Sequence, residues 1–471
     1  MTRRTFVALA GVTVASAWTG RALGALRRLA ATRFATQPGW SLAPLTINTP
    51  ASSVAPGYLF LVPSPPGAPT PGASGPLIMD NDGEPVWFLP LATESALNFK
   101  AQRYKGKPVL TWYEGGTSGS TYGGSCVIYD ATYHEVKRVH AGNGLACDGH
   151  EFTITDRDTA LLAIYNEVPV AGSPALVEGV VQETDIATGK VLFEWHSLDH
   201  VPLAESFRPA VTAAGNIDYF HLNSIGVDRD GNLIVSARHT STIYKLDRKS
   251  GDIIWRLGGM KSDFTLDPGA AFNFQHDART HDDGTLTLFD NGATDAGAGD
   301  VEPHSRPMRL RLDTTAKTAT LAQEYQAATP RLAIATGNLQ QLPNDGALVD
   351  WGTVGAITEF GPDAEVVFDA SLGDGAFTYR AFRLEWTGAP ATKPSVASDG
   401  TNAYASWNGA TEVAFWQLLA GPSASKLTER ATVARRGFET AIPVPPGAGY
   451  VAVAALDAKT RRLSASAAIR V

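Results

Sequence analysis

Short apolar strands and turns alternate along most of the chain, and the alternation follows one repeated phrase. A polar residue opens a strand, a turn containing Asp-Gly or Asn-Gly follows about eight to ten residues later, and three further strands complete the unit. The clearest copy is "FHLNSIGVDRDGNLIVSARHTSTIYKLDRKSGDIIWRLGG", residues 220–259. Further copies occupy residues 98–140, 149–196, 274–325 and 336–371, and a partial copy occupies residues 58–89.

Six units of about 40 to 60 residues with four short strands each are typical of a β-propeller, in which each unit forms one blade. We predict a six-bladed β-propeller over residues 45–390. The partial copy needs a further strand, and "YRAFRLEW" (379–386) supplies one, because ring closure between the two ends of the domain removes an exposed sheet edge. A β-sandwich of the same strands is the alternative, but it does not explain why the whole four-strand phrase repeats.

The repeat stops before residue 394, and residues 394–471 alternate apolar and polar positions in short strands. Segments such as "NAYASWNGATEVAFW" and "YVAVAALDAKTRRLSAS" suit a small sandwich of the fibronectin type III or immunoglobulin kind. The predicted fold class is therefore all-β, with a six-bladed β-propeller followed by a small β-sandwich.

Composition supports a folded chain and excludes one class of partner. Of the 471 residues, 44% are hydrophobic and 18% are charged, and 46 Gly and 29 Pro supply many turns. The net charge is -8 and no segment is dense in Lys and Arg, so the sequence lacks the electrostatic pattern of a nucleic-acid-binding protein. After the N-terminal segment, no stretch is long and apolar enough for a membrane span.

The N-terminus reads "MTRRTFVALAGVTVASAW", in which Arg3 and Arg4 precede a run of small and apolar residues. This order is typical of a twin-arginine export signal. We predict that residues 1–37 direct export and that the protein is secreted or associated with the cell envelope; an amphipathic helix is the alternative. In an exported protein Cys126 and Cys147 could form one disulfide, and two buried thiols are the alternative.

Histidine recurs at one position of the repeat. His150, His221 and His276 open the first strand of three successive units, and Asn338 has the same place in the next unit. The first strand of each blade lines the central channel of a propeller, so equivalent residues converge on one axis. A single histidine at such a position is most often structural, but three of them indicate a site.

The second strand of the unit ends in a polar residue in four copies: Glu114, Asn166, Arg238 and Asn291. Turn capping explains such residues in general. Arg238 differs, because a guanidinium carries a permanent charge and a planar set of donors that suit a carboxylate, a phosphate or a sulfate. We therefore predict an anion site at the channel, where the residues that contact the substrate are Asn223, Asn166, Asn291 and Phe220.

Three histidines near one arginine allow two kinds of chemistry. They could hold a metal ion such as zinc, as in a metal-dependent hydrolase or lyase. Alternatively, one neutral histidine attacks an electrophilic phosphorus or sulfur, its neighbours transfer protons, and Arg238 stabilises the transferred group. The permanent cation disfavours a metal, so we predict neither metal nor cofactor; a non-catalytic binding propeller is the third possibility.

These segments resemble the PAPS-independent arylsulfate sulfotransferase family, in its fungal and actinobacterial branch. The residues that carry the likeness are "FHLNSI…DGNLIVSARH" (220–239), "GDIIWRLGG" (251–259), "FQHDA" (274–278) and "LFDNG" (288–292), and it extends to "SWNGATEVAFW" in the tail. The resemblance implies a six-bladed propeller that passes a sulfuryl group through a histidine.

Taken motif by motif, the resemblance implies that His276 accepts the sulfuryl group in a ping-pong reaction. His221 and His150 correspond to the proton-transferring histidines, and Arg238 corresponds to the arginine that holds the sulfuryl oxygens. The implied partners are an aryl sulfate donor and a phenolic acceptor. A monomer is the favoured oligomeric state.

Overall fold

The computed structural model describes residues 32–64, 72–91, 94–116, 122–207, 210–212, 215–292, 302–373 and 375–471. Within these ranges almost every regular element is a strand, and the α-helical part is α1 (Ser197–His200). The predicted all-β class is confirmed. No helix in this part of the chain is long and apolar enough to cross a membrane. Arg3, Arg4 and most of the predicted export segment lie outside the described residues.

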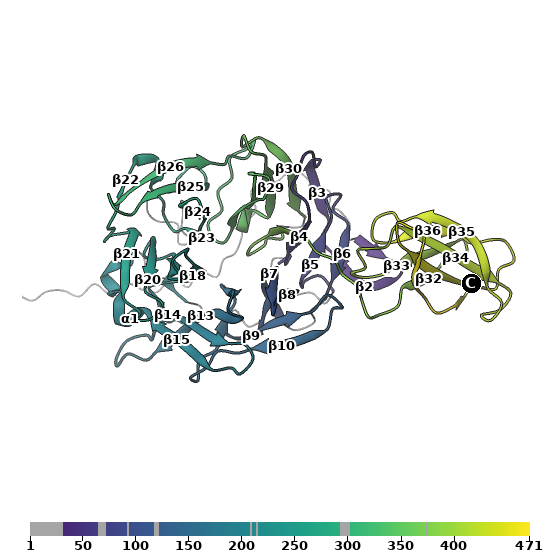
Figure 1. Cartoon of the computed structure of the whole chain (residues 1–471), viewed down its shortest axis with the longest axis horizontal. Helices are drawn as coiled ribbons and strands as arrows, with labels where there is room; N and C mark the ends of the chain where they lie inside the picture. The colour runs from purple at the N-terminus through teal and green to yellow at the C-terminus, as the bar shows by residue number, and fades with distance from the viewer. Residues whose placement is uncertain are drawn as a thin grey trace, which may run out of the picture.

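The described residues between 45 and 390 form six sheets, each built on four antiparallel strands, and Figure 1 shows these sheets arranged about a common centre. One sheet combines the two ends of this region: β31 (Phe382–Leu384), β4 (Tyr58–Leu61), β5 (Leu77–Met79) and β6 (Pro85–Phe88). The next contains β7 (Glu94–Tyr104), β8 (Lys107–Gly116), β9 (Tyr122–Tyr129) and β10 (Glu135–Val139), with β11 (Cys147–Asp148) beside β9. A third contains β12 (Phe152–Ile154), β13 (Thr159–Val168), β14 (Leu176–Asp185) and β15 (Val191–His196), extended by β16 (Ala210–Val211) and β17 (Ile217–Asp218).

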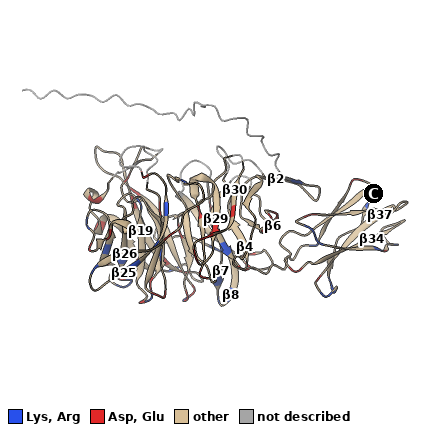
Figure 2. Ribbon diagram, turned by 90° about the horizontal axis from the view of Figure 1, so that it is seen from above, with Lys and Arg blue, Asp and Glu red and all other residues tan. Residues whose placement is uncertain are grey.

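The remaining three sheets follow the same plan. They contain β18 (Leu222–Val227), β19 (Leu233–Ala237), β20 (Thr242–Leu246) and β21 (Ile253–Gly258); then β23 (His276–Thr280), β24 (Thr285–Asp290), β25 (Arg306–Asp313) and β26 (Thr318–Glu324), with β22 (Thr265–Leu266); then β27 (Asn338–Gln341), β28 (Ala347–Asp350), β29 (Ala356–Phe360) and β30 (Val366–Leu372). In Figure 1 the first strand of a sheet lies near the centre and the fourth lies at the rim, as β18 and β21 illustrate. Seen from above in Figure 2, the sheets stand side by side in a disc.

The two ends of the disc meet in adjacent sheets. Strand β31 pairs with β4 through Phe382 and Phe60, so the predicted closure by residues 379–386 is confirmed. Strand β3 (Leu45–Thr49) adds to β30 on the neighbouring sheet. Each pairing joins a strand from one end of this region to a sheet from the other end. Two sheet edges that would otherwise be exposed are therefore covered.

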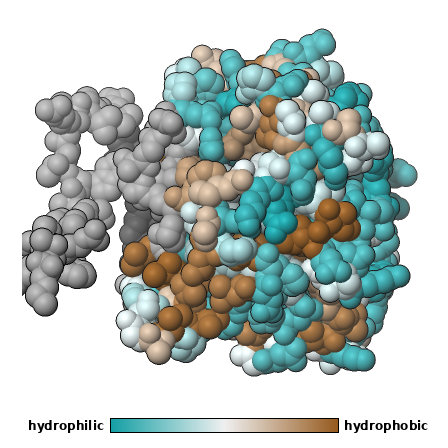
Figure 3. Space-filling view, turned by 90° about the vertical axis from the view of Figure 1, so that its left-hand side faces the viewer, coloured by the Kyte–Doolittle hydropathy of each residue, from teal (hydrophilic) through white to brown (hydrophobic). Residues whose placement is uncertain are grey.

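Apolar side chains fill the space between neighbouring sheets. Fully buried indoles are supplied by Trp112, Trp195 and Trp351. The rim is mixed: on the edge formed by β21, β22 and α1, Figure 3 shows hydrophobic groups among hydrophilic ones, and Ile254 on β21 is 45% exposed. Cys126 and Cys147 are both buried and their thiols are free.

Residues 394–471 form two further sheets beside the disc, as Figures 1 and 2 show. One contains β32 (Ser395–Ser398), β33 (Asn402–Ser406) and β36 (Thr440–Pro443); the other contains β35 (Thr428–Ala434), β34 (Phe415–Gly421), β37 (Tyr450–Leu456) and β38 (Arg462–Ala465), with β39 (Ile469–Arg470) on β37. The hairpin of β1 (Thr32–Phe34) and β2 (Gln37–Leu42) completes the strands. Asn408 ties the tail to the disc, because its amide accepts from Phe88 N at 3.0 Å and donates to Phe88 O at 2.9 Å.

A buried ion pair fastens the closing strand. Arg383 on β31 pairs through Nε with Glu359 of β29, and neither side chain is exposed. Arg383 Nη1 also donates to Asn81 Oδ1 at 2.8 Å and to Gly57 O at 3.2 Å. Glu359 Oε1 in turn accepts from Ala55 N at 2.6 Å, so this pair binds both ends of the disc together.

We expect Arg383→Ala to lower the free energy of unfolding by about 3 to 5 kcal/mol, because it leaves the Glu359 carboxylate buried without its partner. Urea denaturation followed by tryptophan fluorescence measures the loss. Arg309→Ala is the matched control: Arg309 pairs with Asp283 at the surface, where removal costs less than about 1 kcal/mol. Equal losses for the two variants would contradict the assigned role of Arg383.

Candidate functional site

The three predicted histidines all lie at the beginning of a first strand. His150 precedes β12, His221 precedes β18 and His276 begins β23. His221 has φ +55°, a left-handed conformation that non-glycine residues seldom adopt. Asp277, which follows His276, has φ +54°. Non-glycine residues with a left-handed backbone often lie at functional positions. At His221 and Asp277 this backbone interrupts the alternation of side chains between the two faces of a strand.

An aromatic cluster brings two of the histidines together. The rings of His150 and His221 lie 5.1 Å apart between centroids and are nearly perpendicular. Tyr165 stacks on His150 at 4.9 Å and meets His221 edge-on at 5.5 Å. Tyr379, from the closing segment, meets His150 at 5.3 Å, and its hydroxyl donates to His150 O at 3.1 Å. The two imidazoles are therefore held in fixed orientations.

His276 is buried, and one amide fixes its tautomer. Asn291 Oδ1 lies 2.6 Å from His276 Nδ1. The Nδ2 group of Asn291 donates to Ala333 O at 2.8 Å and to Thr336 O at 3.0 Å, so the oxygen is left to accept. The Nδ1 atom of His276 consequently carries the proton, and its Nε2 atom carries a lone pair. Burial, followed by the charge of Arg238, holds the pKa of His276 well below the usual 6.5, so the ring is neutral near pH 7.

A carboxylate holds each of the other two histidines. Asp148 Oδ1 binds His150 Nδ1 and also accepts from His150 N at 2.9 Å. Asp218 Oδ2 lies 2.5 Å from His221 Nδ1, and its Oδ1 accepts from His221 N at 3.0 Å. In both pairs Nδ1 is bound to a carboxylate, so Nε2 is the ring nitrogen that can serve another partner. Burial lowers the pKa of His221 well below its usual value, with smaller contributions from His150 and Arg238.

Arg238 follows β19 and is 3% exposed. Its Nη2 donates to Ile334 O at 2.8 Å, and its Nη1 lies 3.4 Å from His239 Nε2. Its charge lowers the pKa of both His221 and His276, so one guanidinium acts electrostatically on two of the predicted histidines.

The structure places the predicted substrate contacts in different surroundings. Asn223 is buried; its Nδ2 donates to Gln275 O at 2.7 Å, and its Oδ1 has no hydrogen-bond partner among the described residues. Asn166 donates to Glu178 Oε1 at 2.8 Å. Asn338 clamps the closing segment through two bonds of 3.0 Å with Ala381.

Phe220, predicted from the sequence to contact the substrate, packs in the protein core. Its side chain is 0% exposed and lies in a hydrophobic cluster, 5.6 Å from Tyr244 and 5.9 Å from Trp195 between ring centroids. The left-handed turn at His221 separates the two side chains, so the histidine is partly accessible while the phenylalanine packs between sheets.

A buried ionic cluster adjoins the site, and sequence reasoning missed its cations. Glu151 is 1% exposed and binds Lys100 Nζ at 3.0 Å, Arg380 Nη1 at 3.1 Å and Arg279 Nη2. Burial alone would raise the pKa of Glu151, but the three cations hold it well below its usual range. Arg279 also pairs with Asp277 at 2.6 Å. Glu151 and Asp277 thus form ion pairs with Lys and Arg side chains rather than contacts with the histidines.

One set of described side chains has the spacing of a metal site: Asp218, His221 and His239, whose potential ligand atoms lie within 4.8 Å of one another. This set differs from the three-histidine set predicted from the sequence. Its members already bond to each other, since His221 Nδ1 binds the Asp218 carboxylate and His239 Nδ1 lies 2.8 Å from Asp218 O. Both nitrogens would have to lose a proton before a metal could bind.

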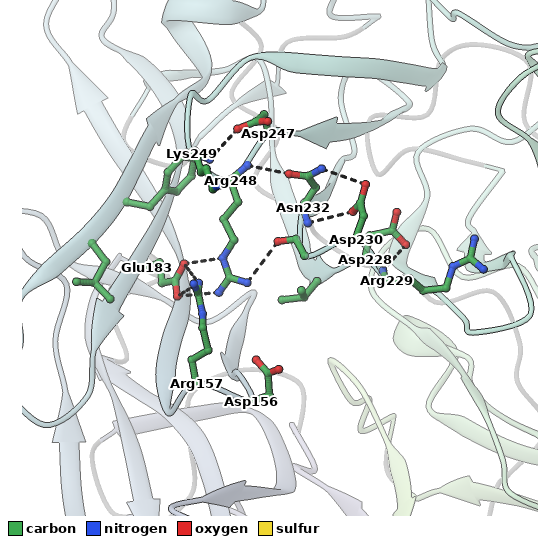
Figure 4. A pocket seen from close by; sticks show the side chains of 14 residues that line it. Asp156, Arg157, Glu183, Asp228, Arg229, Asp230, Asn232, Asp247, Arg248 and Lys249 are labelled. Carbon is green, nitrogen blue, oxygen red and sulfur yellow. Dashed lines mark hydrogen bonds and ion pairs between the residues drawn. The ribbon is translucent and has the colours of Figure 1, made fainter.

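A large surface cavity, of about 630 Å³, lies elsewhere. Figure 4 shows its charged lining, in which Arg157 and Arg248 converge on Glu183, and the lining includes Val227 at the far end of β18 from His221. A strand rises about 3.3 Å per residue, so the length of β18 separates this cavity from the histidines.

Similarity to known proteins points to one family. Residues 100–373 match the family model described as arylsulfotransferase (ASST). None of the curated proteins matches the chain. Among solved structures, a Bacteroides caccae protein of unknown function is 15% identical, covering 69% of this chain and 98% of its own, with a TM-score of 0.42.

Two further structures are similarly distant. A protein of unknown function from Dyadobacter fermentans is 13% identical, covering 68% of this chain and 92% of its own, with a TM-score of 0.38. A streptogramin B lyase is 11% identical, covering 77% of this chain and 94% of its own, with a TM-score of 0.37. The family match, by contrast, spans more than half of the chain and contains all three histidines and Arg238. The protein therefore belongs to the arylsulfotransferase family.

Proposed function

We propose that this protein transfers a sulfuryl group from an aryl sulfate to a phenol, with His276 as the nucleophile. The observation that carries the proposal is a difference between the histidines: an amide backs His276, whereas carboxylates back His150 and His221. Membership of the arylsulfotransferase family supports the reaction class. The three histidines have equivalent positions in the sequence repeat, but their different hydrogen-bond partners suit them to different roles.

In the first half-reaction, His276 Nε2 forms a bond to sulfur and the bond between sulfur and the aryl oxygen breaks. The electron pair of that bond leaves with the phenolate, which takes a proton from water or from an imidazole, His221 or His150, that was protonated in a preceding turnover. Arg238 binds the sulfuryl oxygens and orients the group as it passes from the aryl oxygen to Nε2. The product is a sulfohistidine and a free phenol.

The amide behind His276 keeps this intermediate reactive. Once Nε2 carries the sulfuryl group and Nδ1 keeps its proton, the ring is charged like an imidazolium. A carboxylate at Nδ1 would stabilise that charge and reduce the tendency of the ring to leave. The neutral oxygen of Asn291 orients the ring and supplies no such stabilisation.

In the second half-reaction, the incoming phenol must lose its proton as its oxygen attacks sulfur. His221 suits this step, because its lowered pKa leaves Nε2 neutral near pH 7 and Asp218 stabilises the imidazolium that forms. The proton that His221 gains is then available to the leaving phenolate of the next turnover. His150, held by Asp148, is the second candidate for the same work.

The finer architecture belongs to the same proposal. We interpret the six sheets as the blades of a propeller over residues 45–390, and the tail sheets as a fibronectin-III-like sandwich over residues 394–471. Residues 1–37 carry the proposed twin-arginine export signal, whose Arg3 and Arg4 support a secreted or envelope-associated protein. The proposed catalytic histidines lie at or just before the beginning of first strands, and Arg238 directly follows a second strand.

A metal-dependent hydrolase or lyase is the second candidate, and the spacing of Asp218, His221 and His239 favours it over a binding protein. It predicts stoichiometric zinc in the purified protein, lost together with activity in His221→Ala. The sulfohistidine mechanism predicts full activity after treatment with a chelator.

Incubation with 4-nitrophenyl sulfate without acceptor should produce an acid-labile sulfuryl adduct on the peptide that contains His276, detected by mass spectrometry. His276→Ala should abolish the adduct and lower kcat/KM by at least about 10³-fold, because the nucleophile is lost. The exposed His134, in the turn between β9 and β10, gives the matched control. His134→Ala should form the adduct and retain the wild-type kcat/KM. Turnover without an adduct in the wild-type protein would contradict the mechanism.

The rate of adduct formation from 4-nitrophenyl sulfate should stay constant from about pH 8 to about pH 6 and fall only in stronger acid. Burial and Arg238 lower the pKa of His276, so its neutral form persists below the pH at which an ordinary histidine becomes charged. This donor releases a weakly basic phenolate that needs little help from a general acid. Single-turnover rates measure the profile, and an acid limb with a midpoint near pH 6.5 would count against the assigned nucleophile.

A further inference from the structure

His239, the residue after Arg238, has no role in the proposed reaction, yet it is 3% exposed and lies inside the site. Its ring is tilted against that of His221 at 4.6 Å between centroids. Its Nδ1 lies 2.8 Å from the carbonyl oxygen of Asp218, and its Nε2 lies 3.4 Å from Arg238 Nη1. One imidazole thus bridges a backbone carbonyl and a guanidinium.

The two partners of His239 determine which of its ring nitrogens carries the proton. A carbonyl oxygen can only accept, so Nδ1 of His239 carries the proton that it donates to Asp218 O. A guanidinium can only donate, so Nε2 of His239 accepts from Arg238 Nη1. Burial, together with the neighbouring His221, lowers the pKa of His239 to about 3, and the ring keeps this neutral tautomer across the physiological range.

A neutral acceptor has a specific advantage beside an arginine that must bind an anion. Carboxylates orient arginines well, but each brings a negative charge that competes with the ligand. The imidazole of His239 and the carbonyl of Ile334 hold Nη1 and Nη2 of Arg238 without adding charge. These two contacts orient the guanidinium and add no negative charge to that of the Asp218 carboxylate, which already interacts with Arg238.

We infer that His239 is a positioning residue, which fixes the guanidinium of Arg238 toward the sulfuryl oxygens through its neutral Nε2 atom. The inference rests on the proposed function for the identity of the anion. It assigns to the Arg238-His239 pair a joint task, in which the first residue binds charge and the second supplies an uncharged support.

Three substitutions separate orientation from charge. His239→Asn keeps a donor where Nδ1 bonds Asp218 O but is too short to reach Arg238. His239→Gln places an amide oxygen near the position of Nε2, and His239→Glu places a charged acceptor there. The probe is inorganic sulfate, whose Kd is measured by isothermal titration calorimetry at constant ionic strength, beside kcat and KM for 4-nitrophenyl sulfate.

We expect His239→Asn to weaken sulfate binding by about 10-fold and His239→Gln to recover most of that loss, because an oriented hydrogen bond to an ionic group contributes to affinity. His239→Glu should bind sulfate no better than His239→Asn, although it supplies an acceptor, because its charge repels the ligand. In an Arg238→Ala background, the three substitutions should have no further effect on sulfate binding.

Equal affinities in His239→Asn and His239→Gln would overturn the inference, and so would a His239→Asn effect that persists in the Arg238→Ala background. A melting temperature reduced equally in all three variants, with unchanged sulfate affinity, would reduce His239 to a structural residue. Failure of the proposed function is visible separately, as a wild-type protein that binds sulfate through Arg238 yet forms no adduct on His276.

Discussion

The hydrogen bond behind each histidine is the interaction on which the site depends. The hydrogen bond at Nδ1 of an imidazole determines whether Nε2 carries a proton or a lone pair. Asn291 makes this bond to His276, and Asp148 and Asp218 make it to His150 and His221. A neutral amide leaves a ring that gives up its substituent readily, whereas a carboxylate stabilises the imidazolium that forms when Nε2 takes up a proton. The proposed division of labour among the three histidines therefore depends on the side chains that bind their Nδ1 atoms.

The fold makes this arrangement rigid by carrying the supporting bonds across sheets. Asn291 ends one second strand and reaches the carbonyls of Ala333 and Thr336, which lead into the next sheet. Arg380, beside the closing strand, contacts Glu151 from a sheet that is 229 residues earlier in the sequence. The contacts between the two ends of this region, which include the ion pair of Arg383 and Glu359, therefore support the site as well as the stability of the fold.

The sequence predicted the strands and the histidine positions because both follow from local pattern. Turns of the Asp-Gly type set the repeat, and His150, His221 and His276 occupy the same place in it. Asp148 and Asp218 lie within three residues of their histidines and could have been found, but only by foreseeing that the chain turns back on itself, as the left-handed φ of His221 allows. Phe220 packs in the core, a position that its sequence neighbourhood does not distinguish from an aromatic wall of the site. Arg380 and Lys100 were beyond reach, because the contacts that bury them join distant parts of the chain.

The central claim is that His276 reacts as a neutral ring protonated at Nδ1, and nitrogen NMR of protein labelled at histidine tests it most directly. The two ring nitrogens of a neutral imidazole resonate at distinct shifts according to which one carries the proton. The account predicts a protonated Nδ1 and an unprotonated Nε2 for His276 near pH 7, and the loss of this fixed tautomer in Asn291→Ala. The opposite tautomer, or a charged ring at that pH, would contradict the account.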